Sequence, residues 1–129
     1  MRVKFTEEQK WSATTHEVLE VYLDSEFWSS LTDLSATSTP EVLDIKRDAH
    51  TAVVRLHYVL AVDLPKEASR FIDPNDVAWV EETTWTLKDM SAQVRFLADQ
   101  ASQLLKANAS AALAQQGDSA VRSVRGEVK

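Results

Sequence analysis

The stretch VAWVEETTWTL, residues 77–87, places two tryptophans six positions apart with acidic and hydroxyl side chains between them. Side chains alternate along a β-strand, so both tryptophans would share one face with two of the polar residues. That face carries Trp79, Glu81, Thr83 and Trp85. A wall that is apolar at both ends and polar in the middle is unusual for a dry core and suits a cavity that holds a ligand.

The side chains on this face suggest a division of labour in ligand binding. Glu81 and Thr83 could hold the polar end of a ligand, while Trp79 and Trp85 stack on its apolar part. A desolvated Glu81 would also have a raised pKa and could act as an acid or a base. Simpler interpretations remain open, in which the tryptophans pack in a core and Glu81 forms a salt bridge at a strand edge or is solvated.

Two more aromatic residues fall on the apolar sides of predicted strands. Tyr58 lies on the unbroken apolar face of AVVRLHYVLAV, residues 52–62. Phe96 lies on the same side of a later strand as Val94. Tyr58 could donate a hydrogen bond to a ligand, or it could be a core tyrosine whose hydroxyl is satisfied within the protein.

Two arginines also lie on the same side of their predicted strands as apolar residues. Arg122 falls on the apolar side of the last strand, and Arg47 shares a side with Leu43 and Ile45. An arginine in a cavity wall needs a carboxylate partner, from Glu81 or from a ligand. Alternatively, each arginine lies at a strand end, where its guanidinium reaches water.

The common sequence motifs for metal binding, nucleophilic catalysis and phosphate binding are absent from this sequence. The chain has no cysteine, and His16 and His57 form no HxH or HExxH pattern. No GxSxG elbow is present, and Gly117 and Gly126, the only two glycines, cannot build a glycine-rich phosphate loop. We therefore expect no metal and no cofactor, and the sequence reveals no catalytic site.

Composition restricts the classes of partner. A chain of 129 residues that is 44% hydrophobic is long enough for one domain with its own core. The net charge of -6 repels nucleic acid and anionic membranes. The N-terminal MRVKFTEEQKW lacks the apolar run of a signal peptide, and no segment is apolar over the roughly 20 residues of a membrane span. We expect a cytoplasmic protein that does not bind nucleic acid.

The spacing of hydrophobic residues changes along the chain between two residues, as in a strand, and about 3.6 residues, as in a helix. Thr14 and Glu17 have the spacing of a capping box, and Phe27, Leu31 and Leu34 have the spacing of a helical face. The predicted elements are a strand at 2–7, a helix at 15–23, a second helix through about residue 34, a strand at 42–47, a strand at 52–62, a helical turn or two in KEASRFI at 66–72, the strand at 77–87 and a further strand through 94–98.

LADQASQLLKANASAALAQQ, residues 97–116, fits two structures. Leucines and alanines recur at helical spacing, and the alanine content favours a helix. At a period of two, Leu105, Ala107, Ala109 and Leu113 form one side of a strand, and a turn at Gly117 leads into another strand. Propensity and spacing alone favour the helix.

Several motifs resemble a known superfamily. ATTHEVLEVYLDSEFWSSL resembles the opening helices of the START-like, helix-grip (SRPBCC) superfamily. LPKEASRFIDPNDVAWVEETTW and the terminal VRGEVK resemble an actinobacterial branch that is a domain of unknown function. The resemblance implies one α+β domain over residues 1–129, with a curved antiparallel sheet of about seven strands, two short helices after the first, and strands at 104–115 and 119–128.

The superfamily also implies a long C-terminal helix after GEVK, where this chain stops. Without that helix, part of the apolar sheet face would be exposed, so we expect dimerisation through that face or poor solubility.

Three functions follow as hypotheses. The first is binding of a hydrophobic small molecule or lipid between sheet and helices, without chemistry, by Trp79, Glu81, Thr83, Trp85, Tyr58, Phe96 and Arg122. The second is an enzyme of the cyclase or dehydratase type, with Glu81 transferring protons while Arg122 or Tyr58 polarises a carbonyl. The third is a protein-interaction module that uses its apolar sheet face.

Overall fold

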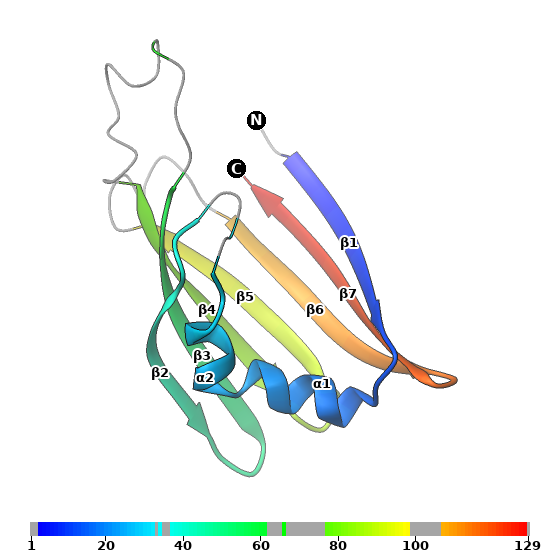
Figure 1. Cartoon of the computed structure of the whole chain (residues 1–129). Coiled ribbons are helices and arrows are strands. Elements are labelled where there is room, and N and C mark those ends of the chain that lie inside the picture. Colours follow the sequence, from blue (N-terminus) through cyan, green and yellow to red (C-terminus); the bar gives the residue numbers. More distant parts are fainter. Residues whose placement is uncertain are drawn as a thin grey trace.

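The computed structural model describes residues 3–32, 34, 37–61, 66, 77–98 and 107–128. Their elements are β1 (Val3–Trp11), α1 (Thr15–Tyr22), α2 (Ser25–Ser29), β2 (Glu41–Arg47), β3 (Thr51–Val59), β4 (Ala78–Thr86), β5 (Ser91–Ala98), β6 (Ala107–Gln116) and β7 (Ser119–Val128). The strands form one seven-stranded antiparallel sheet in the order β1-β7-β6-β5-β4-β3-β2 (Figure 1). The predicted α+β architecture, with two short helices after the first strand, is confirmed.

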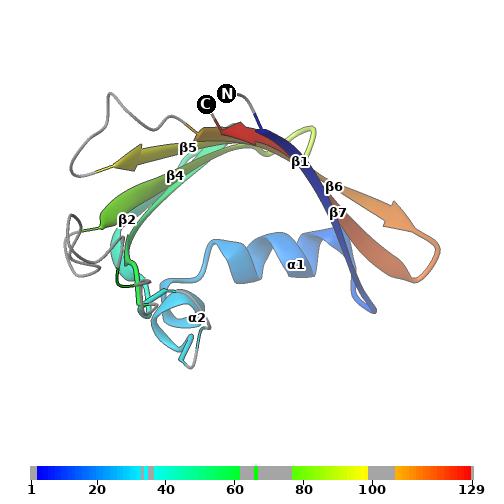
Figure 2. The same ribbon diagram turned by 90° about the horizontal axis from the view of Figure 1, so that it is seen from above.

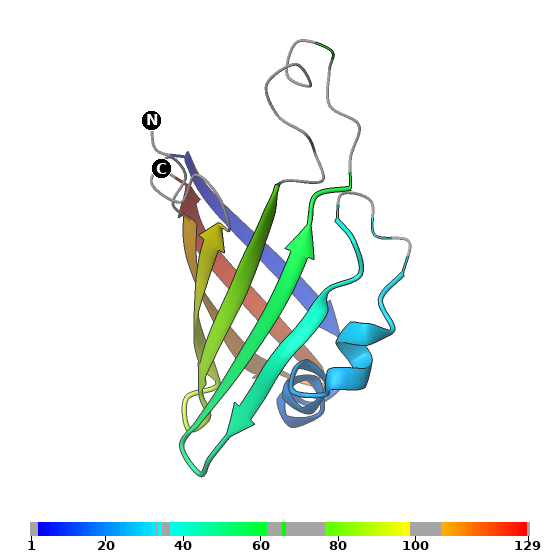
Figure 3. The same cartoon turned by 90° about the vertical axis from the view of Figure 1, so that its left-hand side faces the viewer.

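The sheet curves around the two helices. Viewed from above, the strands form an arc and α1 lies inside it (Figure 2). Viewed from the side, the helices lie against one end of the concave face, and the chain termini lie toward the other end (Figure 3). Among the described residues no helix is longer than α1. The long C-terminal helix that the resemblance implies therefore has no counterpart there. None of the described helices is long and apolar enough to cross a membrane.

Helix α1 begins at the predicted capping box. The Thr14 hydroxyl accepts a hydrogen bond from the Glu17 amide (3.1 Å), and the Glu17 carboxylate accepts one from the Thr14 amide (3.2 Å). Val18 and Leu19 are buried against the sheet, so the cap and the apolar side together fix the helix across the concave face.

Helix α2 is shorter than the predicted helix, which extended to about residue 34. It begins after the Asp24 cap and ends at Ser29. The Ser30 hydroxyl donates to the Phe27 carbonyl (2.6 Å), and the Thr39 hydroxyl donates to the Leu31 carbonyl. These side-chain bonds satisfy carbonyls that a longer helix would have used, which explains the early end.

Strand β2 contains an irregularity that overturns one predicted face. The register shifts between Val42 and Asp44, so Val42 lies opposite Leu56 while Ile45 lies opposite Val54. Leu43, which was expected on the same side as Ile45, is 46% exposed. A β-bulge adds one residue to a strand, so the side chains beyond it point to the opposite face from the one that simple alternation predicts.

Strand β6 decides between the two structures that its sequence allows. Residues 107–116 pair with β5 on one side and with β7 on the other. The strand implied by the resemblance is therefore confirmed there, and the helix favoured by propensity is wrong. Its inward residues are mostly alanines, of which Ala109 and Ala111 are buried, and backbone pairing on both edges outweighs their helix propensity. Residues 99–106 and the turns predicted in KEASRFI lie outside the described residues, apart from Lys66.

Candidate functional site

Four of the predicted site residues meet in one cavity on the concave face. This cavity, the inner pocket, has a volume of about 20 Å³. It is lined by Tyr22, Trp28, Val54, Leu56, Glu81, Thr83, Trp85 and Arg122. A cavity of this size holds about one water molecule, so the inner pocket can receive a polar group but not a whole ligand.

Strand register explains which side chains enter the inner pocket. Leu56 lies opposite Glu81, and Val54 lies opposite Thr83, so β3 and β4 present a half-apolar, half-polar patch to the interior. Arg122 comes from β7, which is three strands away from β4 in the sheet order. The curvature of the sheet turns both strands toward the same interior, and so brings an acidic and a basic residue into one cavity (Figure 2).

Glu81 is an acid in an environment that disfavours its charged form. Burial raises the pKa of Glu81, and the nearby Arg122 guanidinium lowers it by a smaller amount. Among the described residues, no hydrogen bond or ion pair within 4.0 Å is made by the Glu81 carboxylate. The charge of Arg122 therefore acts on Glu81 through space, without direct contact.

Arg122 is held on one side and unsatisfied on another. Its Nη1 donates a hydrogen bond to the Gln9 side-chain oxygen (2.9 Å), and its guanidinium carbon lies 5.3 Å from the centre of the Tyr22 ring. The Nε atom is buried and has no hydrogen-bond partner among the described residues. The predicted position of Arg122 on the inner face is thus observed, whereas direct pairing with Glu81, one of the partners considered for it, is not.

An aromatic cluster from the helices, β1 and β4 closes the site, and its members Tyr22 and Trp28 were not among the predicted site residues. Tyr22 is at its centre, with ring centroids 5.7 Å from Trp28, 6.1 Å from Trp85 and 6.4 Å from Trp11. The Trp28 Nε1 atom donates to the Tyr22 carbonyl (2.9 Å), which fixes the junction between α1 and α2. The run of aromatic residues at the ends of two adjacent short helices was the available signal.

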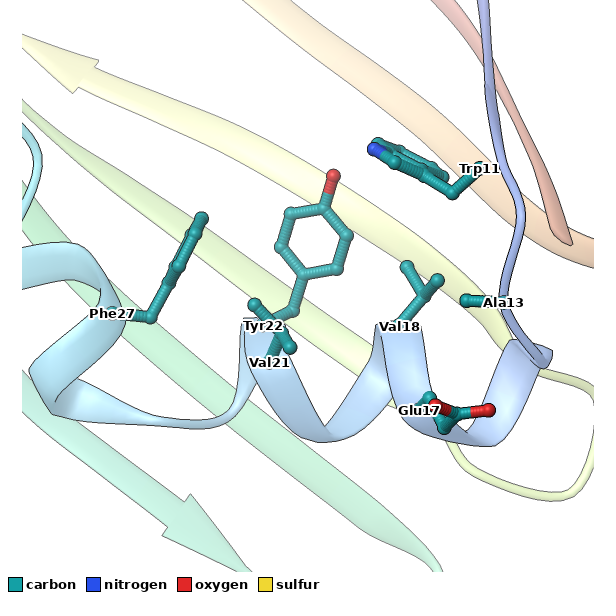
Figure 4. A pocket seen from close by; sticks show the side chains of 7 residues that line it. All are labelled: Trp11, Ala13, Glu17, Val18, Val21, Tyr22 and Phe27. Carbon is teal, nitrogen blue, oxygen red and sulfur yellow. The ribbon is translucent and has the colours of Figure 1, made fainter.

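A larger apolar groove adjoins the inner pocket. It has a volume of about 280 Å³ and is lined by Trp11, Ala13, Glu17, Val18, Val21, Tyr22 and Phe27 (Figure 4). In Figure 4 the aromatic side chains rise from the helices and from the end of β1 toward a common space. Tyr22 lines both the apolar groove and the inner pocket, so the two cavities meet at this residue.

The remaining predicted residues form a second group on the concave face. Tyr58 and Trp79 lie opposite each other on β3 and β4 and stack with ring centroids 5.7 Å apart. Phe96 lies opposite Glu81 on β5 and packs beside the core. Burial, with a smaller contribution from Glu81, raises the pKa of Tyr58. These aromatic residues therefore extend the wall away from the helices and do not line the inner pocket.

Arg47 and the histidines do not join the site. Arg47 forms an ion pair with Glu20 of α1 (2.8 Å), so its carboxylate partner is Glu20 and not Glu81. His16 lies near Glu20 on the exposed side of α1. Within the described residues, no group of three or more metal-ligating side chains is found.

One edge of the concave face carries exposed apolar side chains, as was expected for an uncovered sheet face. Val3 and Phe5 of β1 are 52% and 36% exposed. Gly126 lies beneath the Phe5 ring, since a Cβ atom there would be 2.2 Å from that ring. Dimerisation through this face stays a prediction.

Solved structures with the same arrangement include enzymes. The Zhui aromatase/cyclase of Streptomyces sp. R1128 is 15% identical, with a TM-score of 0.63 over 100% of this chain and 68% of that one. Norcoclaurine synthase of Thalictrum flavum, solved with a transition-state analogue, is 14% identical, with a TM-score of 0.62 over 99% and 76%. A protein from Thermus thermophilus is 15% identical, with a TM-score of 0.65 over 96% and 72%. At these identities the likeness shows the fold, which is the helix-grip arrangement.

Sequence comparison gives the family. A search of curated proteins found no match to this chain. The model of a family described as a protein of unknown function, DUF2505, matches residues 6–129, which is nearly the whole chain. The protein therefore belongs to this family of unknown function.

Proposed function

We propose that the protein binds a hydrophobic small molecule on its concave face, between the sheet and the two helices, and performs no chemistry on it. The observation that carries this proposal is the inner pocket, in which Glu81 and Arg122 face the same interior without a direct bond between them. Burying charged side chains in an apolar wall costs free energy, and a direct ion pair between them would offset part of that cost. A ligand that contacts them would supply the missing partner.

The dimensions of the site favour a small ligand over a long lipid chain. The apolar groove, at about 280 Å³, is close to the lower end of the range for small-molecule sites, roughly 300–1,000 Å³. Its wall is mostly aromatic and aliphatic, which suits a flat apolar body. Solved relatives of the same fold include an aromatase/cyclase and a norcoclaurine synthase with a bound transition-state analogue, which supports a small organic ligand here.

The first test is to identify what the purified protein carries. Protein from a native preparation is denatured, and the released small molecules are compared by mass spectrometry with those from a Trp28→Ala, Tyr22→Ala double variant. An apolar molecule of small size that is present with the wild type and depleted with the double variant is the expected result. Equal recovery from both proteins would overturn the proposed location.

A second candidate function is an enzyme of the cyclase or dehydratase type. The observation that favours it is Glu81, a buried carboxyl group in the inner pocket whose pKa is raised by burial, as is common for residues that transfer protons. Arg122 could then polarise a carbonyl oxygen of the substrate in the same pocket. Two of the compared structures are enzymes by name, an aromatase/cyclase and a norcoclaurine synthase.

The two candidates differ in what Glu81→Gln would do. For a binding protein, the variant should still retain the molecule that the wild type carries. For an enzyme, the wild type should convert that molecule on prolonged incubation, and the variant should leave it unchanged. Glu82→Gln is the matched control, because Glu82 lies on the opposite face of the same strand.

A further inference from the structure

The bonding of Arg122 leaves part of its guanidinium unused. A guanidinium carries five N–H donors in a fixed plane. In this structure Nη1 is bonded to Gln9, and one face of the group lies over the Tyr22 ring. Nε is buried without a partner among the described residues. Buried donors are nearly always bonded, so this one indicates a place where an acceptor is expected.

The size of the inner pocket limits what that acceptor can be. At about 20 Å³ it accommodates a group of one or two oxygen atoms, whereas the rest of a ligand must lie elsewhere. The apolar groove adjoins it, since Tyr22 lines both cavities. A single ligand that displaces the Tyr22 ring would place an apolar body in the groove and a polar end beside Arg122.

The charge balance of the inner pocket selects the sign of that polar end. The guanidinium is always cationic. Burial favours the neutral form of Glu81, and a neutral carboxyl group can donate a hydrogen bond to an anion as well as accept one. Within the described part of the chain, no other charged side chain lines this cavity. An anionic oxygen is therefore complementary to the pocket, whereas a second cation would be repelled by Arg122.

We infer that the ligand is a flat apolar molecule that carries one carboxylate group, with its body in the apolar groove and its carboxylate at Arg122 and Glu81. This inference depends on the proposed binding function and adds the chemical class of the ligand. The net charge of the protein, -6, slows the approach of an anion. Selection for a carboxylate therefore arises within the site and not from long-range attraction.

Three probes that differ only in one substituent test the inference. Tryptophan fluorescence is followed while 2-naphthoate, 2-naphthylmethanol or 2-naphthylmethylammonium is added to the wild-type protein. Because a charge-assisted hydrogen bond is stronger than a neutral one, 2-naphthoate should bind about tenfold or more tightly than the alcohol. The ammonium probe should bind most weakly of the three.

Two variants assign the selectivity to Arg122. Arg122→Gln should lower the affinity for 2-naphthoate by roughly ten- to a hundredfold and leave that for the alcohol nearly unchanged. Arg125→Gln is the control, because Arg125 is an exposed residue on the other side of the same strand. The comparison of probes on the wild type remains decisive even if Arg122→Gln folds poorly.

The outcomes separate the two proposals. If none of the three probes binds, the proposed binding function is wrong. If the alcohol binds as tightly as 2-naphthoate, the binding function stands and the inference about a carboxylate is wrong. Tightest binding of the ammonium probe would also overturn the inference, since it would mean that Glu81 acts as the charged partner.

Discussion

Glu81 and Glu82 are consecutive residues of β4 with opposite surroundings. Glu82 faces the convex side, where it pairs with Arg55 (2.9 Å) and Arg95 (3.5 Å). Arg55 also pairs with Asp44 (3.0 Å), so a charged network extends over four strands of the convex face. Glu81 faces the concave side and makes no such bond among the described residues. One residue type is thus used for structure on one side of the strand and left available on the other.

The difference indicates what each face of the sheet is for. On the convex face every one of these charges has a partner, which suits a surface that serves stability. On the concave face Glu81 and Arg122 lie in a more enclosed place and remain unbonded to each other. A site that must bind something else keeps its polar groups free at a cost in stability. Variants on the two faces should therefore differ in stability, in both sign and size.

Trp85 walls the inner pocket and should make the largest contribution to stability. It is 2% exposed and is part of the core beneath the helices. Trp85→Ala should lower the free energy of unfolding by about 3–5 kcal/mol. Thr86→Ala, at an exposed position on the next residue, is the control for chemical denaturation. A loss below about 1 kcal/mol would mean that the helices do not pack on this strand as described.

Glu82→Gln should destabilise the protein by a moderate amount. The Glu82 side chain is 15% exposed and accepts a hydrogen bond from Arg55. Removing its charge weakens two ion pairs, for an expected loss of roughly 1–2 kcal/mol in urea unfolding. If the variant were as stable as the wild type, the convex network would not serve stability.

Glu81→Gln should instead stabilise the folded protein at neutral pH. Because burial raises the pKa of Glu81 above that of an unfolded glutamate, about 4.3, ionisation costs the folded state more than the unfolded state. That cost is absent at low pH and grows as the pH rises above about 4.3. The variant cannot ionise, so its melting temperature should exceed that of the wild type at pH 7, and the gain should vanish near pH 3.5. A variant that melts lower at pH 7 would show that the Glu81 charge is paired.

Salt should produce the smallest difference between the two faces. The destabilisation by Glu82→Gln should shrink between low salt and about 1 M NaCl, because the Debye length falls to about 3 Å. The effect of Glu81→Gln should change less, since desolvation and not long-range attraction causes it. Paired melting curves of both variants at two salt concentrations give the comparison, and equal salt dependence would contradict it.

Much of the site was predictable because strand alternation is a strict rule. The period of two in residues 77–87 predicted that Glu81, Thr83 and Trp85 share a face, and the strand pairing bears this out. The same rule placed Arg122 inward from β7. Where only the period mattered, the sequence was sufficient.

The remaining features depended on contacts between segments distant in sequence. Tyr22 and Trp28 complete the inner pocket because of the angle between α1 and α2, which no local pattern specifies. The β2 bulge reversed the side of Leu43. In β6, pairing on both edges outweighed alanine's preference for helix, and the resemblance to a family was what favoured the strand over the helix.

The most direct measurement is a crystal structure of the wild-type protein with 2-naphthoate bound. We predict the naphthalene ring in the apolar groove beside Tyr22 and Phe27, with a carboxylate oxygen within about 3 Å of the Arg122 guanidinium. A ligand bound outside the concave face would contradict this prediction. So would an Arg122 that turns to form a direct salt bridge with Glu81 and leaves no donor for the ligand.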